Sequence, residues 1–402
     1  MNIAKYDSLP TKVTLLLTST LTVMAGATIA PSLPAMQEYF NNVENSQLLV
    51  QLVLTIPALF IAIAGLFAGQ LVDKFGRKPL LIISTLLYGL AGSSGFVLNS
   101  LGTILIGRVW LGLSVAGLMT SVTTLIADYY TGQKRANFMG LQAAFMGLGG
   151  FVFLSVGGFL ADISWRFPFL IYLSAWLILV AIIVIIYEPD YQTNSHTEDS
   201  AKIEQPSLPI AVLAMIYAIA LWDMVVFYLI PVQLPFYLQN ISNASASASG
   251  LAIATATLAG SLASLRYGFI KERLGFVSII VLAFTIAAVG YFIIGISGSY
   301  NTVLLGLIIA GLGFGLIIPN LNVWLSSIIP DAIRGRALGG LTSSFFLGQF
   351  LSPLISQPIT NSLGFGKTYS FTGGALLVIA LILLVLKKQV QSFCQSCYNN
   401  NS

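Results

Sequence analysis

The sequence predicts an all-α membrane protein whose twelve transmembrane helices form two pseudo-symmetric six-helix bundles. Three observations support this fold class: the composition, the regular spacing of apolar runs, and a repeat that relates the two halves. Of the 402 residues, 56% are hydrophobic and only 8% are charged, and the mean hydropathy is +0.89. Soluble domains carry about 25% charged residues. A soluble protein of this composition could not cover its surface, so the bilayer is its natural solvent.

Apolar runs long enough to cross a bilayer recur along the whole chain. About 20 apolar residues span the hydrocarbon as a helix, because a helix satisfies its own backbone polar groups. We place the spans at residues 13–35, 46–70, 79–98, 101–127, 136–160, 166–187, 208–239, 248–268, 276–296, 301–327, 335–360 and 365–386. The first run contains two prolines and is followed by many similar runs, so we expect a retained span and not a signal peptide.

A polar, charged stretch divides the chain into two parts. Residues 188–207 lack apolar periodicity and read as a cytoplasmic linker between a six-helix bundle at 1–187 and a second one at 208–402, which ends in a short cytoplasmic tail. Lys and Arg gather before the first span, after the last, and in every second gap between spans. The positive-inside rule therefore places both termini and the linker in the cytoplasm. We expect a multi-pass protein of the cell (inner) membrane.

The two halves also share a sequence device. A shift of 199 residues places GQLVDKFG, at residues 69–76, on GFIKERLG, at residues 268–275. Asp73 then falls on Glu272, and the same shift puts Gly112 on Gly311. Parallel repeats related by an axis along the membrane normal are an architecture of transporters.

The stretch GQLVDKFGRK concentrates scarce charge between two apolar runs. A positive-inside anchor would account for Arg77 and Lys78, but an anchor needs no acidic residue and need not recur in the other half. The alternative is a latch, whose charge pairs close the cytoplasmic face in one state and release it in another. Gly69 and Gly76 would let backbone come close at a tight turn. Asp73 would accept hydrogen bonds from a helix N-terminus or pair with arginine.

This stretch resembles the loop signature between the second and third helices of the major facilitator superfamily. With the twelve spans, the linker and the degenerate second copy, the resemblance covers nearly the whole chain. Within the superfamily the sequence is most similar to the twelve-span drug:proton antiporters, whose fourth helix carries an arginine before a small-residue run, here at Arg108. Leu111 stands where that run usually has glutamine. The residues expected in the latch are Gly69, Asp73, Gly76, Arg77, Lys78, Asp128, Arg135, Glu272 and Arg273.

The fifth helix of these antiporters carries a glycine-spaced signature with a Gly-Pro pair before a Gly-Gly pair. The matching glycines are Gly140, Gly149, Gly157 and Gly158. Phe153 and Leu154 occupy the positions of the Gly-Pro pair, so an ordinary apolar site replaces one that permits a bend. This departure leaves the direction of transport open and does not affect the predicted fold.

Ionisable residues inside a span are costly, which makes each one a functional candidate. Asp223 lies near the middle of the seventh predicted span. Desolvation favours its neutral form unless a cation lies close, so it could load and unload a proton; a structural carboxyl bonded to neighbouring helices is the alternative. Arg108 either extends to the headgroups or faces the cavity, where it binds an anionic group or pairs with Asp223. In the family fold, helices 1, 4, 7 and 10 line the central cavity, so the resemblance puts both charges on its wall.

Neutral polar residues supply further candidates for contact with a substrate. They are Thr28, Trp222, Tyr228, Gln233, Asn320 and Asn322. A hydrogen bond between helices explains each of them equally well. Asn320 follows Pro319, which removes a backbone donor and bends a helix.

These features predict a secondary active transporter that exports small organic or amphipathic molecules, drug-like or siderophore-like, by proton antiport with alternating access. A proton-coupled uptake permease for a small nutrient or a metal chelate is the alternative. An enzyme would need a cluster of nucleophiles or metal ligands at bilayer depth, and nothing resembles a nucleotide-binding P-loop. The basic residues form no stripe that would bind nucleic acid. We expect a monomer in the lipid bilayer that handles a small-molecule substrate and protons, with no cofactor and no resident metal.

Overall fold

The computed structural model describes residues 6–189 and 210–399, and the elements in these ranges are all helices. The first half contains α2 (Leu9–Ala27), η1 (Ala30–Ser32), α3 (Leu33–Tyr39), α4 (Ser46–Phe75), α5 (Arg77–Ser93), η2 (Ser94–Phe96), α6 (Leu101–Tyr129), α7 (Gly132–Ile163), η3 (Phe167–Leu173) and α8 (Ser174–Ile185). The second half contains α9 (Ile210–Phe227), α10 (Leu229–Ser242), α11 (Ala246–Leu265), α12 (Tyr267–Lys271), α13 (Phe276–Gly295), α14 (Tyr300–Phe314), α15 (Ile317–Ile328), α16 (Asp331–Leu363) and α17 (Phe365–Asn399). The predicted all-α class is confirmed.

These elements combine into twelve helical segments that are long and apolar enough to cross a membrane, counted over the described residues. The prediction of twelve spans is confirmed, and the bounds agree to within a few residues at most ends. We number the spans in chain order, so that span 1 comprises α2, η1 and α3, span 7 comprises α9 and α10, and span 10 comprises α14 and α15. The predicted linker lies outside the described residues from position 190 onward.

Three spans are interrupted near prolines. Span 1 breaks around Pro31, span 7 changes direction at Tyr228 three residues before Pro231, and span 10 breaks shortly before Pro319. A proline inside a helix removes one backbone hydrogen bond and collides with the preceding turn. The bend predicted at Pro319 is therefore confirmed, and spans 1 and 7 show the same behaviour.

The repeat reappears in the packing of the helices. A Cβ atom added at Gly112 on α6 would lie 2.5 Å from the carbonyl oxygen of Pro57 on α4. A Cβ atom at Gly311 on α14 would collide with the carbonyl oxygen of Ala256 on α11. The shift of 199 residues relates Gly112 to Gly311 and also Pro57 to Ala256. The two halves therefore use the same glycine at the same helix crossing.

Paired tyrosines fasten span 1 to the rest of the first half. The hydroxyl of Tyr88 on α5 donates to the carbonyl oxygen of Leu21 at 2.7 Å. The hydroxyl of Tyr172 in η3 donates to the carbonyl oxygen of Ala25 at 3.1 Å. The two rings lie 5.6 Å apart, and both side chains are fully buried. Both bonds reach α2 just before its break.

The second half repeats this arrangement on span 7. Tyr291 on α13 donates to the carbonyl oxygen of Val226 at 2.6 Å, and Tyr369 on α17 donates to that of Leu229 at 3.1 Å. These two rings lie 5.3 Å apart. The two accepting carbonyls flank the change of direction at Tyr228. We call the two arrangements the tyrosine braces.

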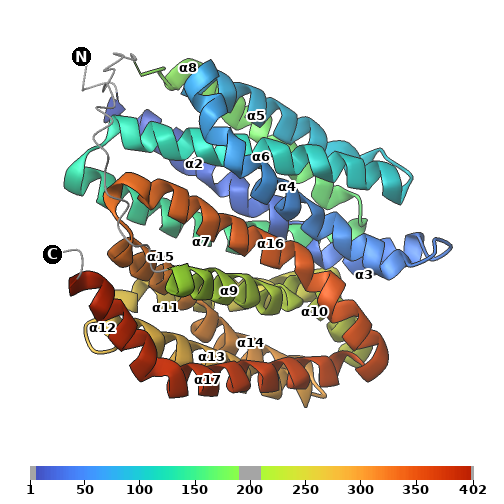
Figure 1. Cartoon of the computed structure of the whole chain (residues 1–402). Coiled ribbons are helices and arrows are strands. Elements are labelled where there is room, and N and C mark those ends of the chain that lie inside the picture. The colour runs from blue at the N-terminus through green and yellow to red at the C-terminus, as the bar shows by residue number, and fades with distance from the viewer. Residues whose placement is uncertain (1–5, 190–209, 400–402) are drawn as a thin grey trace.

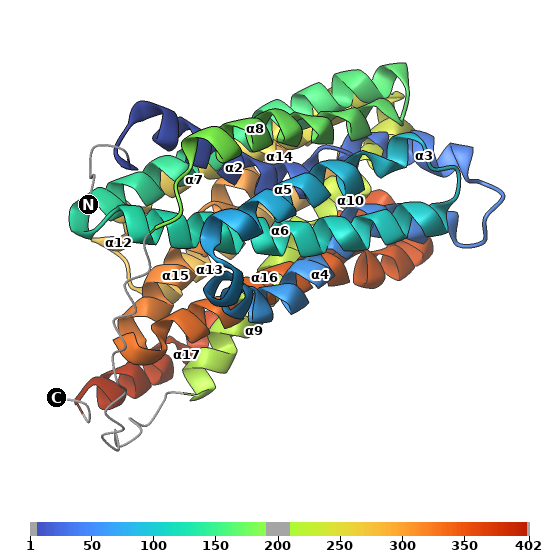
Figure 2. The same ribbon diagram turned by 90° about the horizontal axis from the view of Figure 1, so that it is seen from above.

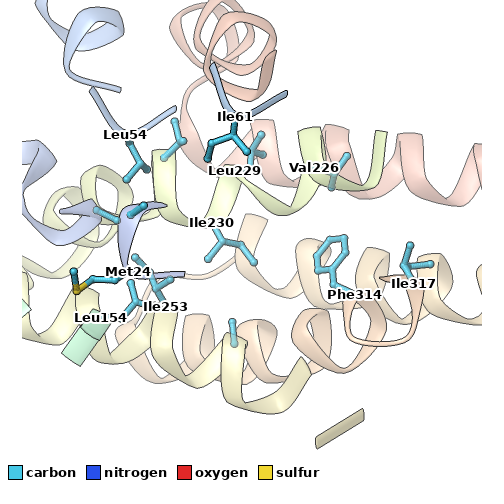
Figure 3. Packing of buried hydrophobic residues seen from close by; sticks show 14 of the residues in the cluster. Met24, Leu54, Ile61, Leu154, Val226, Leu229, Ile230, Ile253, Phe314 and Ile317 are labelled. Atoms are coloured by element: carbon cyan, nitrogen blue, oxygen red, sulfur yellow. The ribbon is translucent and has the colours of Figure 1, made fainter. Parts of the chain in front are cut away.

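The two halves lie beside each other, with the described ends of the chain at one end of the molecule (Figures 1 and 2). We call the end near both termini the terminal face and the opposite end the distal face. Helix α4 packs against α16, and α7 packs against α11, so each half contributes two long helices to the interface. Figure 3 shows buried apolar side chains of both halves, among them Met24, Leu154 and Ile253, which belong to one cluster.

Candidate functional site

On the distal side, α7 approaches both span 1 and the second bundle without intervening side chains. A Cβ atom at Gly157 would collide with the carbonyl oxygen of Thr28, and one at Gly158 would lie 2.8 Å from that of Ala246. These two glycines of the predicted antiporter signature therefore permit close packing, as expected. The contact at Gly158 joins the first bundle to the second.

The other signature glycines differ from each other. At Gly149 a Cβ atom would lie 3.0 Å from Cβ of Thr20, whereas at Gly140 it would meet no described atom within 4 Å. The expected packing role is therefore absent at Gly140 in this conformation, because that part of α7 faces open space. Helix α7 runs without interruption through Phe153 and Leu154, where the signature would have Gly-Pro.

A buried cluster of amides also joins the bundles on the distal side. Nε2 of Gln51 on α4 donates to Oε1 of Gln357 on α16 at 2.8 Å and to Oε1 of Gln233 on α10 at 3.3 Å. Gln233 in turn donates to Gln357 and to Ser356, both at 3.1 Å. The amide of Gln233 is therefore engaged in holding helices together, which is the helix-packing alternative to its expected contact with a substrate.

The hydrogen bonds between the bundles stop about halfway to the terminal face. The last one, from Ser343 Oγ to the carbonyl oxygen of Ala62, measures 3.3 Å. Beyond it, none of the hydrogen bonds or ion pairs between described side chains joins the two halves. The halves diverge toward this end in Figure 2. The molecule is thus joined at its distal face and parted at its terminal face.

The predicted latch stretch forms the turn between α4 and α5. Gly76 occupies this turn with a φ of +88°, and a Cβ atom there would lie 2.9 Å from Oε1 of Glu188. Only glycine fits such backbone without strain. Gly69 lies inside α4, and a Cβ atom there would meet no described atom within 4 Å. The close approach expected at Gly69 is therefore not found in this conformation.

The first helix turn after Gly76 is held by two carboxylates. Arg77 Nε bonds to Oδ2 of Asp128 at 3.0 Å, which ties the start of α5 to the end of α6. Glu188 accepts from the backbone N–H of Arg77 at 2.8 Å and from that of Lys78 at 2.6 Å. A carboxylate at a helix N-terminus is stabilised by the unpaired N–H groups and the helix dipole. Sequence reasoning missed Glu188, because its partners lie more than a hundred positions away.

The remaining latch residues make no contact across the interface. In the described part of the chain, Asp73, Arg135 and Glu272 make no side-chain hydrogen bond or ion pair, and the guanidinium of Arg273 lies 4.2 Å from the ring centre of Phe269 in its own bundle. The latch pairs observed here lie within the first bundle. A closed latch across the terminal face remains a prediction for another state.

Arg108 lies inside the first bundle and is 1% exposed. Its guanidinium is 4.6 Å from the ring centre of Phe169 and 5.0 Å from that of Tyr172, within the range of cation–π attraction. Both terminal nitrogens lack a hydrogen-bond partner in the described structure. The side chain neither extends to the headgroup level nor pairs with Asp223, so two of the expected alternatives are not seen.

Asp223 is fully buried in the second bundle, at 0% exposed. Neither carboxylate oxygen has a hydrogen-bond partner among the described residues, and the same is true of Nε1 of Trp222. Tyr291 of the second tyrosine brace bonds to Val226, three residues further along the same helix. Asp223 and Arg108 therefore occupy separate bundles. The expected position of both charges on the wall of an open cavity is not met in this conformation, because packed helices enclose each of them.

Aromatic side chains of both bundles follow one another from Arg108 toward span 7. The ring of Tyr172 lies beside Arg108 and its hydroxyl bonds to Ala25, next to Gly26, where an added Cβ atom would lie 2.6 Å from the hydroxyl of Tyr228. Phe227 contacts Phe314 at 5.5 Å between ring centres, and Phe314 contacts Tyr291 at 5.6 Å. We call these five aromatic residues the central aromatic cluster. Only Tyr228 was a candidate from sequence, because the others come from separate elements and share no local motif.

The last three sequence candidates are occupied by internal hydrogen bonds. The hydroxyl of Thr28 donates to a carbonyl of its own helix at 2.8 Å, and the amide of Asn322 does the same at 2.9 Å. The amide of Asn320 donates to the carbonyl oxygen of Phe276 at 3.1 Å. The bond of Asn320 agrees with the alternative of a neutral hydrogen bond between helices. Thr28 and Asn322 bond within their own helices, which neither expectation described.

Two repeated six-helix bundles, three interrupted spans and a buried acid in one of those spans define the architecture of a secondary transporter. The chain belongs to the Major Facilitator Superfamily, whose family model matches residues 15–243 and 213–392. The resemblance drawn from the sequence is confirmed. The members of this superfamily are multi-pass membrane transporters of small molecules, and the twelve apolar spans agree with that.

Two similar proteins of known name are drug-resistance proteins. The chain is 26% identical over 333 residues to quinolone resistance protein NorA of Staphylococcus aureus (strain MRSA252), a match covering 79% of this chain and 82% of that protein. It is 25% identical over 340 residues to multidrug resistance protein 2 of Bacillus subtilis (strain 168), covering 80% and 82%.

Solved structures share the fold at lower identity. A D-xylose-proton symporter superposes with a TM-score of 0.80 at 17% identity, covering 93% of this chain and 96% of that one. A bacterial homolog of the human lysosomal transporter Spinster, in an inward-facing and occupied conformation, gives 0.72 at 17% identity, covering 97% and 96%.

Proposed function

We propose that this protein exports small organic, amphipathic molecules from the cytoplasm in exchange for protons. The observation that carries the proposal is Asp223, a carboxyl that is fully buried in span 7 and has no hydrogen-bond partner among the described residues, one helical turn before Phe227 of the central aromatic cluster. The names of the relatives, which include quinolone and multidrug resistance, support a drug-like substrate. The distribution of Lys and Arg supports placing the terminal face in the cytoplasm.

In that orientation the structure is an inward-facing state. The bundles are joined at the outer, distal face by the amides of Gln51, Gln233 and Gln357, and they are parted at the cytoplasmic face. A substrate would enter from the cytoplasm and rest against the central aromatic cluster, where flat, apolar molecules gain contact area and stacking. Rocking of one bundle against the other would then expose the same site to the outside.

The proton and the substrate are exchanged if both compete for the deprotonated carboxylate of Asp223, so that binding of one excludes the other. An unpartnered carboxylate in an apolar site is costly, so the site favours a proton, or a cationic group of a substrate, in place of the bare charge. Substrate binding would displace the proton to the cytoplasm, and outward release would let a proton return. Arg108, enclosed in the other bundle, would stabilise that bundle's part of the site by its contact with Tyr172.

Everted membrane vesicles test this proposal. In vesicles acidified by respiration, a quinolone should cause proton release from the wild-type protein, and Asp223→Asn should abolish the release while leaving the amount of protein in the membrane unchanged. Glu44→Gln is the matched control, since Glu44 is an exposed carboxylate on the distal face. Proton release in Asp223→Asn at the wild-type rate would overturn the assignment of the coupling residue.

A proton-coupled uptake permease is the second candidate. It is favoured by α7, which runs straight through Phe153 and Leu154 where an antiporter signature would carry Gly-Pro. Uptake predicts that intact cells accumulate the substrate above its outside concentration when the membrane is energised. Export predicts that energised cells keep the substrate below its outside concentration. Its concentration inside should rise toward the outside value when the proton gradient is collapsed.

A further inference from the structure

A single carboxylate on the distal face crosses between the bundles. Asp162, in the last turn of α7, accepts a hydrogen bond at 2.7 Å from the backbone N–H of Ala246 and one at 3.2 Å from that of Ser247. Both donors belong to the first turn of α11 in the second bundle. Among the Asp and Glu side chains that the structure describes, no other one bonds across the two bundles; the bonds of Asp128 and Glu188 given above lie within the first.

Asp162 completes the N-terminus of α11. A helix leaves its first backbone N–H groups without partners inside the helix. The side chain of Ser245 accepts from Ala248 at 3.1 Å, and its carbonyl oxygen accepts from Ser249 at 3.0 Å. Asp162 accepts from the two remaining N–H groups of this turn. Its negative charge also lies at the positive end of the α11 dipole, where charge-assisted bonds are strong.

The packing beside this contact makes it depend on the state of the transporter. A Cβ atom at Gly250 on α11 would lie 3.1 Å from Cα of Gly158, so the two backbones touch one turn away from Asp162. Opening of the distal face must separate these backbones, and it must then break the bonds of Asp162. The contact exists in one state and is absent in the other, so its whole free energy biases the equilibrium between them.

We propose that Asp162 is an outer latch, which holds the distal face closed by capping a helix of the opposite bundle. The proposal rests on the proposed function, because it presupposes that the distal face opens during transport. The latch uses the chemistry that the sequence predicted for Asp73 on the terminal face, a carboxylate on a helix N-terminus, on the other side of the membrane. It is built from α7 and α11 and is separate from Asp223.

Thiol labelling measures the opening of the distal face directly. Ser32→Cys, in a protein that also carries Cys394→Ser and Cys397→Ser, places one thiol on η1, which is buried and packs against α7, α10 and α11. A membrane-impermeant maleimide added outside intact cells reacts with this thiol only when the distal face opens. Asp162→Ala should raise the labelling rate about fivefold, as expected for loss of a charge at a helix N-terminus. Asp162→Asn, which keeps an oxygen acceptor without the charge, should give an intermediate rate.

Glu44→Ala is the matched control, because it removes an exposed carboxylate on the distal face that makes no contact across the interface. A second readout is the distance between spin labels at Asn42→Cys and Gly298→Cys, on distal loops of opposite bundles, which should shift toward longer values in Asp162→Ala. If both Asp162 variants label at the rate of Glu44→Ala and show the wild-type distance distribution, the latch is refuted. These readouts need neither substrate nor proton gradient, so they remain decisive even if Asp223→Asn transports normally.

Discussion

At the residue scale, the sequence placed Asp223 and Arg108 inside spans but did not predict which side chains surround them. Both charges lie inside spans, and each was expected to face a shared cavity. The structure encloses them in separate bundles, Arg108 against aromatic rings and Asp223 fully buried without a hydrogen-bond partner among the described residues. Their depth followed from hydropathy, whereas their surroundings depend on which helix faces which, and this is set by packing between distant segments.

Asp7 supplies a pH-dependent contact outside the membrane. Its carboxylate bonds to Lys12 Nζ at 2.7 Å and lies 3.8 Å from that of Lys134, so it links the start of the chain to α7. The hydrogen bond from Lys12 lowers the pKa of Asp7 below its usual value. A lowered pKa means that the contact stabilises the fold above the unfolded pKa and is lost as pH falls through the folded one.

We therefore expect Asp7→Asn to lower the thermal unfolding midpoint slightly at neutral pH, by an amount that corresponds to less than about 1 kcal/mol. The difference from wild type should vanish at pH values below the pKa of Asp7, where wild type has lost the same charge. Unfolding scans in detergent at both pH values measure this. A difference that persists in acid would show that the side chain acts through shape and not through charge.

At the scale of elements, Gly69 and Gly76, at the two ends of one motif, differ in backbone conformation and in how closely other atoms surround them. Gly76 adopts a φ of +88° next to Glu188, while Gly69 lies in the regular helix α4 with open space around it. The sequence predicted a tight turn with glycines, and the turn is present at Gly76. The function of Gly69 remains a prediction for a state in which the terminal face is closed.

Alanine substitutions test the requirement for glycine at each of these two positions. Gly76→Ala should destabilise the protein by about 1–3 kcal/mol, because only glycine adopts this backbone conformation without strain. Gly69→Ala should leave the stability of the conformation described here unchanged or raise it by up to about 1 kcal/mol, since alanine favours helix. If the closed latch needs close approach at Gly69, the same variant should transport poorly despite this stability. Thermal unfolding and vesicle transport, measured on both variants, check the pair; wild-type transport by Gly69→Ala would remove that residue from the latch.

At the scale of the whole molecule, the sequence predicted the parts that depend on local pattern. The twelve spans, the break near Pro319 and the repeat at Gly112 and Gly311 follow from hydropathy, proline chemistry and register. It did not predict the cap of Asp162 on α11 or the central aromatic cluster. Those features join residues far apart in the chain, and no spacing rule indicates such pairings.

The orientation in the membrane is a prediction at the same scale. In a protein that carries Cys394→Ser and Cys397→Ser, Asn42→Cys on the distal face should react with an impermeant thiol reagent in intact cells. Thr131→Cys, at an exposed position on the terminal face, should react only in everted vesicles, because the Lys and Arg residues of that face keep it in the cytoplasm. Labelling of Thr131→Cys from outside intact cells would invert the topology and with it the direction of transport.

The tyrosine braces affect which side chains of the protein can vary during evolution. The braces donate hydrogen bonds to main-chain carbonyl oxygens of spans 1 and 7, and these oxygens are the same whatever amino acid supplies them. The donors are Tyr88, Tyr172, Tyr291 and Tyr369. Variation in the side chains of the gripped spans therefore leaves the frame intact. Substitutions can therefore change the side chains along spans 1 and 7 while the hydrogen bonds that hold these spans to the other helices are retained.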